Sequence, residues 1–139
     1  MTDHRPAHPH AFPHAHRLHG REDFTAVYNA KMRKSSGPLL VFTRPSDRPQ
    51  FRLGLSVSRK VGNAVVRGRV KRMLREAFRL TQPSWSTLDG GGLDLVVVVR
   101  PHTPAALTEY QRHLTSTVEA AVRGWAKRQR GDARPAEGD

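Results

Sequence analysis

The sequence of 139 residues contains no cysteine, which excludes disulfide bonds, thiolate metal sites and cysteine nucleophiles. It also has no apolar run approaching the ~20 residues that a membrane-spanning helix needs. The N-terminus lacks the apolar segment of a secretory signal. We therefore expect a cytoplasmic protein that has no membrane partner.

Acidic residues are scarce relative to basic ones, because 12 Asp and Glu stand against 24 Lys and Arg, a formal net charge of +12. Such an excess repels itself and opposes compaction unless a polyanion neutralises it. Nucleic acid is the first candidate partner and an anionic membrane surface the second. Hydrophobic residues make up only 37% of the chain, so we expect part of it to lie outside the core.

The length suits one compact domain, which we place at residues 17–128. Residues 1–16 combine Pro and His with almost no branched aliphatic side chains, which predicts a disordered tail. Histidines cluster in and just after this segment, but their irregular spacing favours a solvated tail over a metal site. Residues 129–139 are polar and rich in Gly, Pro and Ala, and we interpret them as a flexible C-terminal tail.

Apolar residues three or four positions apart predict helices, and alternating or continuous β-branched runs predict strands. Asn63 fits an N-cap, and Thr103 followed by Pro104 predicts the start of the last helix. Residues 35–38 are rich in Ser, Gly and Pro and predict a break. The expected elements are a helix over 21–30, strands over 39–43 and 51–58, a helix over 64–80, a strand over 93–99 and a helix after 104. The order α-β-β-α-β-α indicates an α+β domain in which a small mixed β-sheet is packed with helices.

The helix over 64–80 is strongly basic on one side. Its apolar positions, from Val66 to Phe78, share one arc, whereas cations follow at i, i+4 spacing from Arg67 to Arg79 on the other side. Like charges at this spacing destabilise a free helix by a few tenths of a kcal/mol per pair, and RNA phosphates would remove that repulsion. A solvated basic face that binds nothing is the alternative. A membrane-surface helix is disfavoured, because the sheet needs the apolar face.

The segment SVSRKVGNAVVRGRVKR, preceded by REDFTAVY and followed by LDLVVVVRP, resembles the protein subunit of bacterial ribonuclease P. The resemblance runs from about Arg17 to Trp125 and implies the ribonuclease P protein-like fold, a ribosomal S5 domain 2-like α+β arrangement. One departure concerns the family's Arg-Asn-Arg signature, where this chain has Arg67-Gly68-Arg69. The Asn amide is lost there, and a glycine inside a helix costs ~1 kcal/mol relative to alanine.

The resemblance implies a ribonucleoprotein endonuclease that removes the 5′ leader from precursor tRNA. The family's RNA subunit performs the hydrolysis, with Mg²⁺ held largely by RNA and substrate. No protein side chain is therefore expected to be catalytic, and no metal site is expected in the protein. The implied partners are the catalytic RNA and precursor tRNA, without an obligate protein partner.

Two sets of binding residues follow from the resemblance. The set for the catalytic RNA lies on the basic helix and just before it: Lys60, Arg67, Gly68, Arg69, Lys71, Arg72 and Arg75. The set for the single-stranded leader lies in a cleft between the sheet and the first helix: Phe24, Tyr28, Phe42, Arg52, Ser56 and Arg59. Aromatic faces that stack on bases and cations that hold phosphates suit single-stranded RNA. Ordinary core packing is the alternative for each ring.

Two other functions fit parts of the sequence. A generic basic or ribosome-associated RNA-binding protein would share the charge, but it would have no reason to share the three segments in order. A protein nuclease would need paired acids or metal ligands. The candidates for such a role are scattered and suggest no catalytic group: Asp23, Glu76, Asp94, His102 and His113.

Overall fold

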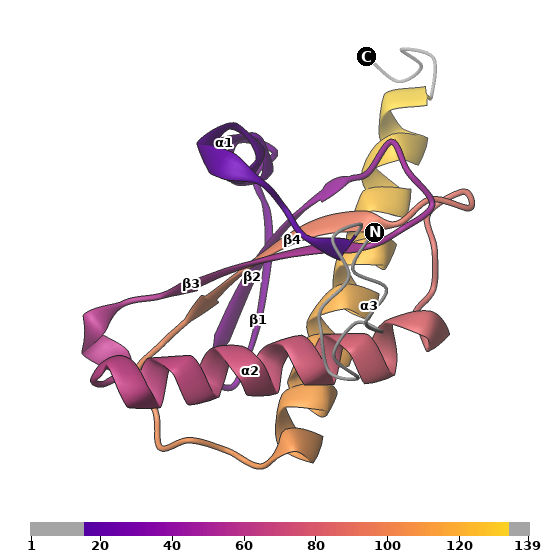
Figure 1. Cartoon of the computed structure of the whole chain (residues 1–139). Coiled ribbons are helices and arrows are strands. Elements are labelled where there is room, and N and C mark those ends of the chain that lie inside the picture. Colours follow the sequence, from indigo (N-terminus) through magenta and orange to yellow (C-terminus); the bar gives the residue numbers. More distant parts are fainter. Residues whose placement is uncertain (1–15, 134–139) are drawn as a thin grey trace, which may run out of the picture.

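A computed structural model of the chain describes residues 16–133. One four-stranded sheet, with strand order β1-β2-β4-β3, carries three α-helices (Figure 1). Strands β3 and β4 are parallel and the other pairs are antiparallel. The elements are α1 (Gly20–Asn29), β1 (Met32–Ser36), β2 (Leu39–Pro45), β3 (Arg52–Val57), α2 (Ala64–Thr81), β4 (Leu93–Val99) and α3 (Leu107–Ala133), with 3-10 turns η2 (Arg59–Val61) and η3 (Gln82–Ser84).

The predicted α+β class is confirmed, and the predicted elements follow one another in the predicted order. Strand β1 is an addition that the sequence did not indicate, because MRKSS contains no β-branched residue and runs into the expected break. It lies at the edge of the sheet, where β2 pairs with it on one side only. Met32 is buried and α3 packs on the strand. Tertiary packing therefore overrides the weak local β-propensity.

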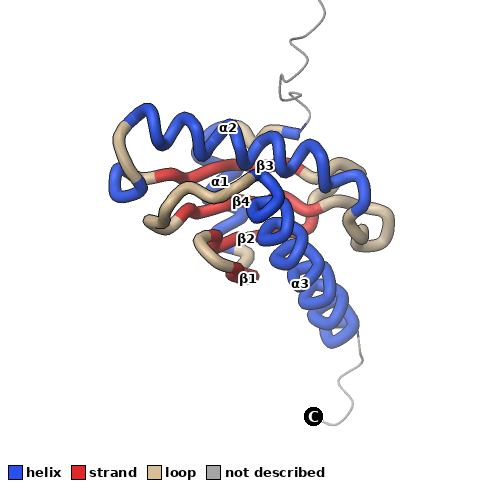
Figure 2. Tube along the Cα trace, turned by 90° about the horizontal axis from the view of Figure 1, so that it is seen from below, coloured by secondary structure: helices blue, strands red, loops and turns tan. Residues whose placement is uncertain are grey.

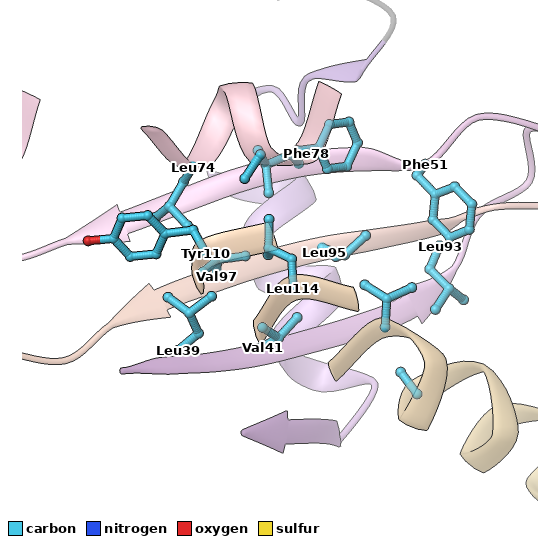
Figure 3. Close-up of a cluster of buried hydrophobic side chains, with 14 of the residues drawn as sticks. Leu39, Val41, Phe51, Leu74, Phe78, Leu93, Leu95, Val97, Tyr110 and Leu114 are labelled. Carbon is cyan, nitrogen blue, oxygen red and sulfur yellow. The ribbon is translucent and has the colours of Figure 1, made fainter. Parts of the chain in front are cut away.

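Helices α2 and α3 cover one face of the sheet, and α1 lies on the other (Figures 1 and 2). Alternation along the strands divides the side chains between these faces. The main core forms beneath α2 and α3, where β2 and β4 meet Leu74 and Phe78 of α2 and Tyr110 and Leu114 of α3 (Figure 3). Trp85, which we placed in a loop, belongs to this core: it is 4% exposed, and its indole N–H donates to Thr115 Oγ1 at 3.0 Å.

The last helix differs from its prediction at both ends. It begins at Leu107, so the predicted start at Thr103 and Pro104 is wrong. Residues 100–106 form an irregular segment, in which the Tyr110 hydroxyl accepts the Ala105 N–H and is hydrogen-bonded to His102 Nε2. The helix then continues to Ala133, so residues 129–133, which we assigned to the C-terminal tail, are helical.

The remaining boundaries can be compared only in part. Residues 1–15 of the expected N-terminal tail and residues 134–139 of the C-terminal one lie outside the described residues. His16 is described, and its Nδ1 hydrogen-bonds to the Phe51 carbonyl at 2.8 Å. Within residues 16–133, no helix is both long and apolar enough to cross a bilayer.

Candidate nucleic-acid interface

The sheet face under α1 consists of three rows of side chains that cross the strands. The register aligns Arg44 with Asp94 and Arg52, then Phe42 with Val96 and Gly54, then Leu40 with Val98 and Ser56. A small cluster built on Leu18, Val27 and Val96 packs under α1, with Phe24, Tyr28, Phe42 and Val98 against it. Leu40, Val98 and Ser56 remain partly exposed, so this row is the open part of the face.

The predicted leader-binding rings meet at the boundary of this cluster. Phe24 lies on β3 at Gly54, where a Cβ would come within 2.5 Å of the Phe24 Cζ atom. Tyr28 and Phe42 stack edge to face, with ring centroids 4.9 Å apart. All three rings are half-buried. They therefore pack in a small core and also present ring surface beside the open row.

Arg52 is placed differently from the rings. Its Nε and Nη2 each donate to Asp94 at 2.8 Å, and the residue is only 6% exposed. The hydrogen bonds with Asp94 raise the Arg52 pKa. Asp94 also accepts from Arg44 Nε at 2.8 Å, and Asp23 of α1 lies 3.9 Å from Arg52 Nη1. We call Asp23, Arg44, Arg52 and Asp94 the buried ion cluster. Arg52 supports α1 from within it and offers no free cation to a ligand.

The other two predicted leader residues lie toward the end of β3. Ser56 is half-buried in the open row, and Arg59 is exposed in η2. Lys60 of the catalytic-RNA set is exposed beside Arg59. The Ser58 hydroxyl caps this turn by accepting from the Lys60 N–H. The two cations thus stand just beyond the open row.

Helix α2 begins as predicted, since the Asn63 side chain accepts the Val66 N–H at 2.9 Å. Val70, Leu74, Ala77 and Phe78 are its buried residues. Arg69 and Arg72 are exposed, whereas Arg67, Lys71 and Arg75 are half-buried. The basic side of α2 therefore has an outer part that is open to solvent and an inner part that lies against the rest of the molecule.

The inner part of α2 borders the cleft. A hollow of about 190 Å³ is lined by Arg17, Leu18, Phe24, Leu53, Gly54, Leu55, Lys71 and Arg75. Three of these side chains are cationic, and no acidic residue lines the hollow. Burial, together with the nearby charge of Arg17, lowers the Arg75 pKa. The hollow joins the basic helix to the ring at Phe24, and it provides positive charge where an RNA phosphate could bind.

Lys71 and Arg75, which the resemblance assigns to the catalytic-RNA surface, thus also line the hollow at Phe24, together with Arg17, which belongs to neither predicted set. A helical wheel places Lys71 and Arg75 opposite the apolar arc, but it does not tell which neighbour lies there. The sequence does indicate that Asp94 needs a partner. A carboxylate within a continuous aliphatic strand is costly to bury unless it is paired with a cation. That signal predicts arginine partners without identifying them.

Gly68 lies in the first half of α2 and is half-buried. A Cβ added there would meet only Arg72 Nη1, at 3.4 Å. A Cβ at this position is therefore in ordinary contact with one flexible side chain and meets no backbone. The absence of the family's Asn at this position is not explained by packing within the chain.

The residues considered for a nuclease centre have structural partners. Asp23 and Asp94 face the arginines of the buried ion cluster, and His102 is hydrogen-bonded to Tyr110. Glu76 accepts from Arg79 Nε at 3.0 Å, and His113 Nδ1 is hydrogen-bonded to Ser36 Oγ at 2.7 Å. Burial lowers the His113 pKa. Within residues 16–133, no group of three or more His, Asp or Glu residues is arranged to hold a metal ion.

Comparisons with known proteins identify relatives of this domain. The family model described as Ribonuclease P matches residues 12–122. The ribonuclease P protein component of Exiguobacterium sp. is 34% identical over 115 residues, which cover 83% of this chain and 96% of the relative. That of Methylococcus capsulatus is 40% identical over 101 residues, covering 72% and 73%.

Solved structures agree with these sequence matches. The RNase P protein of Staphylococcus aureus superposes with a TM-score of 0.63 at 29% identity, covering 76% of this chain and 94% of that one. The RNase P protein of Thermotoga maritima gives a TM-score of 0.54 at 29% identity, covering 81% and 96%.

Proposed function

The chain belongs to the bacterial ribonuclease P protein family, and on this premise we propose that it binds the catalytic RNA and the 5′ leader of precursor tRNA through two adjoining surfaces. The outer surface consists of Lys60, Arg69 and Arg72, which are exposed cations. The inner surface is the cleft formed by α1, the open row and the hollow beside α2. The catalytic RNA takes the outer surface and the leader takes the inner one.

The observation that carries this proposal is the hollow beside α2. Its lining combines three cations, Arg17, Lys71 and Arg75, with the aromatic residue Phe24. Cations beside an aromatic face are the combination that holds single-stranded RNA without strict sequence preference, since phosphates pair with the cations and bases stack on the rings. A leader that enters from the catalytic RNA meets the hollow first and the open row next.

The protein's contribution to the reaction is electrostatic and positional. Two RNAs repel each other through their phosphates, and a protein of charge +12 that contacts both reduces this repulsion. Binding of the leader also places the cleavage site of the substrate with respect to the catalytic RNA. No described acid, base or nucleophile is arranged to perform hydrolysis, and hydrolysis is assigned to the RNA subunit.

Mg²⁺ is assigned to the RNA and the substrate. The three candidate carboxylates among the described residues do not fit a magnesium site, because Asp23 and Asp94 face arginines in the buried ion cluster and Glu76 is paired with Arg79. The assembly works in the cytoplasm and needs no further protein. A generic RNA-binding protein is the alternative, and it would lack a preference for leader-bearing substrates.

The function is tested by reconstitution with a bacterial ribonuclease P RNA. The protein should restore cleavage of precursor tRNA at millimolar Mg²⁺, where RNA alone is slow, because its charge replaces divalent screening. Arg69→Gln combined with Arg72→Gln should weaken binding of the RNA subunit. Arg48→Gln combined with Arg112→Gln is the matched control, since both cations are exposed and neither lies on α2 or lines the hollow beside it. Absence of stimulation across a Mg²⁺ titration would refute the assignment.

A further inference from the structure

A second group of cations lies at the β1 edge of the sheet, opposite the edge that carries the hollow. It consists of Lys31, Arg33 and Lys34 from the start of β1 and Lys127 and Arg128 from the C-terminal half of α3, and we call it the edge patch. Helix α3 approaches β1 closely here, because a Cβ at Gly124 would lie 3.0 Å from Met32 Cε and 3.7 Å from Lys34 Cε. The patch therefore combines two segments about 90 residues apart in the chain.

Arg128 holds these segments together. Its Nη1 donates to the Ala30 carbonyl at 3.0 Å and its Nη2 to the Lys31 carbonyl at 3.2 Å, while the guanidinium lies 4.6 Å from the centroid of the Trp125 ring. These contacts fix the cation without neutralising it. Its charge stays available beside Lys31.

The remaining charges of the patch are not neutralised either. Among the side chains that the structure describes, over residues 16–131, none of the five cations forms an ion pair with a carboxylate. The buried ion cluster under α1 differs, because each of its arginines faces an aspartate. Cations near a helix C-terminus do interact favourably with the helix dipole, but this effect does not account for Lys31, Arg33 and Lys34 on the strand.

The helix itself continues past the point where packing requires it. Between Leu107 and Gly131, Trp125 is its last buried residue, yet α3 runs on to Ala133, and Figure 2 shows these last turns extending beyond the sheet. Lys127, Arg128 and Arg130 on these turns are exposed. The extension adds positive surface and no core.

The edge patch is continuous with the cleft. Arg33 is the register partner of Phe42, so its side chain leaves the sheet on the α1 side, next to the Tyr28–Phe42 pair. Lys31 lies in the short link between α1 and β1. The sheet order puts β3 with the hollow at one edge and β1 with the patch at the other, a separation of roughly 15 Å for three strand spacings.

We propose that the edge patch binds the phosphates of leader nucleotides that extend beyond the cleft. This inference rests on the proposed function and adds a direction to it: the leader crosses the sheet from the hollow at β3 to β1 and then follows α3. Exposed, unneutralised cations suit the backbone of a flexible single strand, because they hold phosphates without reading bases. The catalytic RNA is the less favoured occupant, since its surface on α2 lies at the opposite edge.

The test measures binding of precursor tRNAs with short and long leaders to the reconstituted holoenzyme. Arg33→Gln combined with Lys127→Gln removes two exposed cations without touching the contacts of Arg128. For the long leader, the slope of log K against log salt should fall by about 1.4, from two contacts at ~0.7 each. Binding of the short leader and of the RNA subunit should stay as in the wild type. Arg48→Gln with Arg112→Gln, which changes the net charge equally, should alter neither.

Four outcomes would overturn the inference. An equal loss for short and long leaders, or a loss in binding of the RNA subunit, would assign the patch to the catalytic RNA. A wild-type preference for long leaders that the variant keeps in full would refute only the edge patch. A wild-type holoenzyme with no leader preference would refute the proposed leader cleft, and the edge patch with it.

Discussion

The two ends of the sheet face under α1 are built in opposite ways. At one end, the buried ion cluster pairs its charges, with Asp94 fully buried and accepting three hydrogen bonds at 2.8 Å. At the other end, Leu40, Val98 and Ser56 stay partly exposed, although Val98 packs against the cluster under α1. The closed end holds α1 in place, and the open end leaves the surface that a ligand can use.

This difference shows how one helix can be both anchored and adjacent to a binding surface. Asp23 on α1 lies 3.9 Å from Arg52 and 4.0 Å from Arg44, and its carboxylate also accepts the His19 N–H at 2.8 Å. These contacts also hold the backbone of the next residue, Phe24, in place. Rigid support behind a contact residue reduces the entropy lost on binding.

The closed end should dominate stability, and Asp94→Ala should have the largest effect of the changes considered. Removing one partner of a buried ion pair leaves the other charge uncompensated and costs about 3–5 kcal/mol. In Asp94→Ala, the buried guanidinium of Arg52 would lose the carboxylate that accepts its two hydrogen bonds. Urea denaturation measures the loss. Asp23→Ala is the control: its ion pairs are longer and its hydrogen bond from the His19 N–H is exposed, so it should cost about 1 kcal/mol. Equal losses for both variants would contradict this division.

The packing of the Phe24 ring on β3, in the row between these two ends, can be tested at Gly54. A Cβ there would come within 2.5 Å of Phe24 Cζ, so Gly54→Ala should displace the ring and cost roughly 1–3 kcal/mol of stability. Leader binding should weaken in parallel, because the ring leaves the hollow. The double variant Gly54→Ala, Phe24→Leu should recover stability without recovering leader binding. Full recovery of binding would show that the ring only fills space.

The open end should affect binding more than folding. Tyr28→Ala should cost roughly 1–3 kcal/mol in binding if a base stack is lost, and only for substrates with a leader. Tyr28→Phe keeps the ring and should bind as the wild type does. The measurements are binding of long-leader and leaderless substrates, with a melting curve for each variant. A large drop in melting temperature, with equal effects on all ligands, would assign Tyr28 to the core instead.

The smallest effect is expected on the outer surface, at Gly68. Asn is the better residue inside a helix, so Gly68→Asn should raise stability by a few tenths of a kcal/mol, and a Cβ there meets only the flexible Arg72 side chain. Binding of the RNA subunit should be unchanged or tighter, since the family's Asn is restored. Weaker binding would show that RNA approaches the α2 backbone more closely than an Asn side chain allows.

The basic helix was predictable from sequence because its information is local. The N-cap at Asn63, the apolar arc and the charge all lie within some twenty residues, and a 3.6-residue period turns them into faces. The buried strand over 93–99 was equally clear. Strand β1 was not, because its formation depends on pairing with β2 and on contact with α3 at Gly124.

The sequence by itself determined the charge, the α+β order, the family and the residue types of both predicted surfaces. Only the tertiary structure decided which of those residues share a surface. It placed Arg52 in a buried ion cluster, brought Lys71 and Arg75 to the cleft with Arg17, and held Arg128 of α3 against the backbone of Ala30 and Lys31 at the sheet edge. The physical reason is that periodicity gives the direction of a side chain relative to its own helix or strand, whereas its partners come from segments far away in the chain.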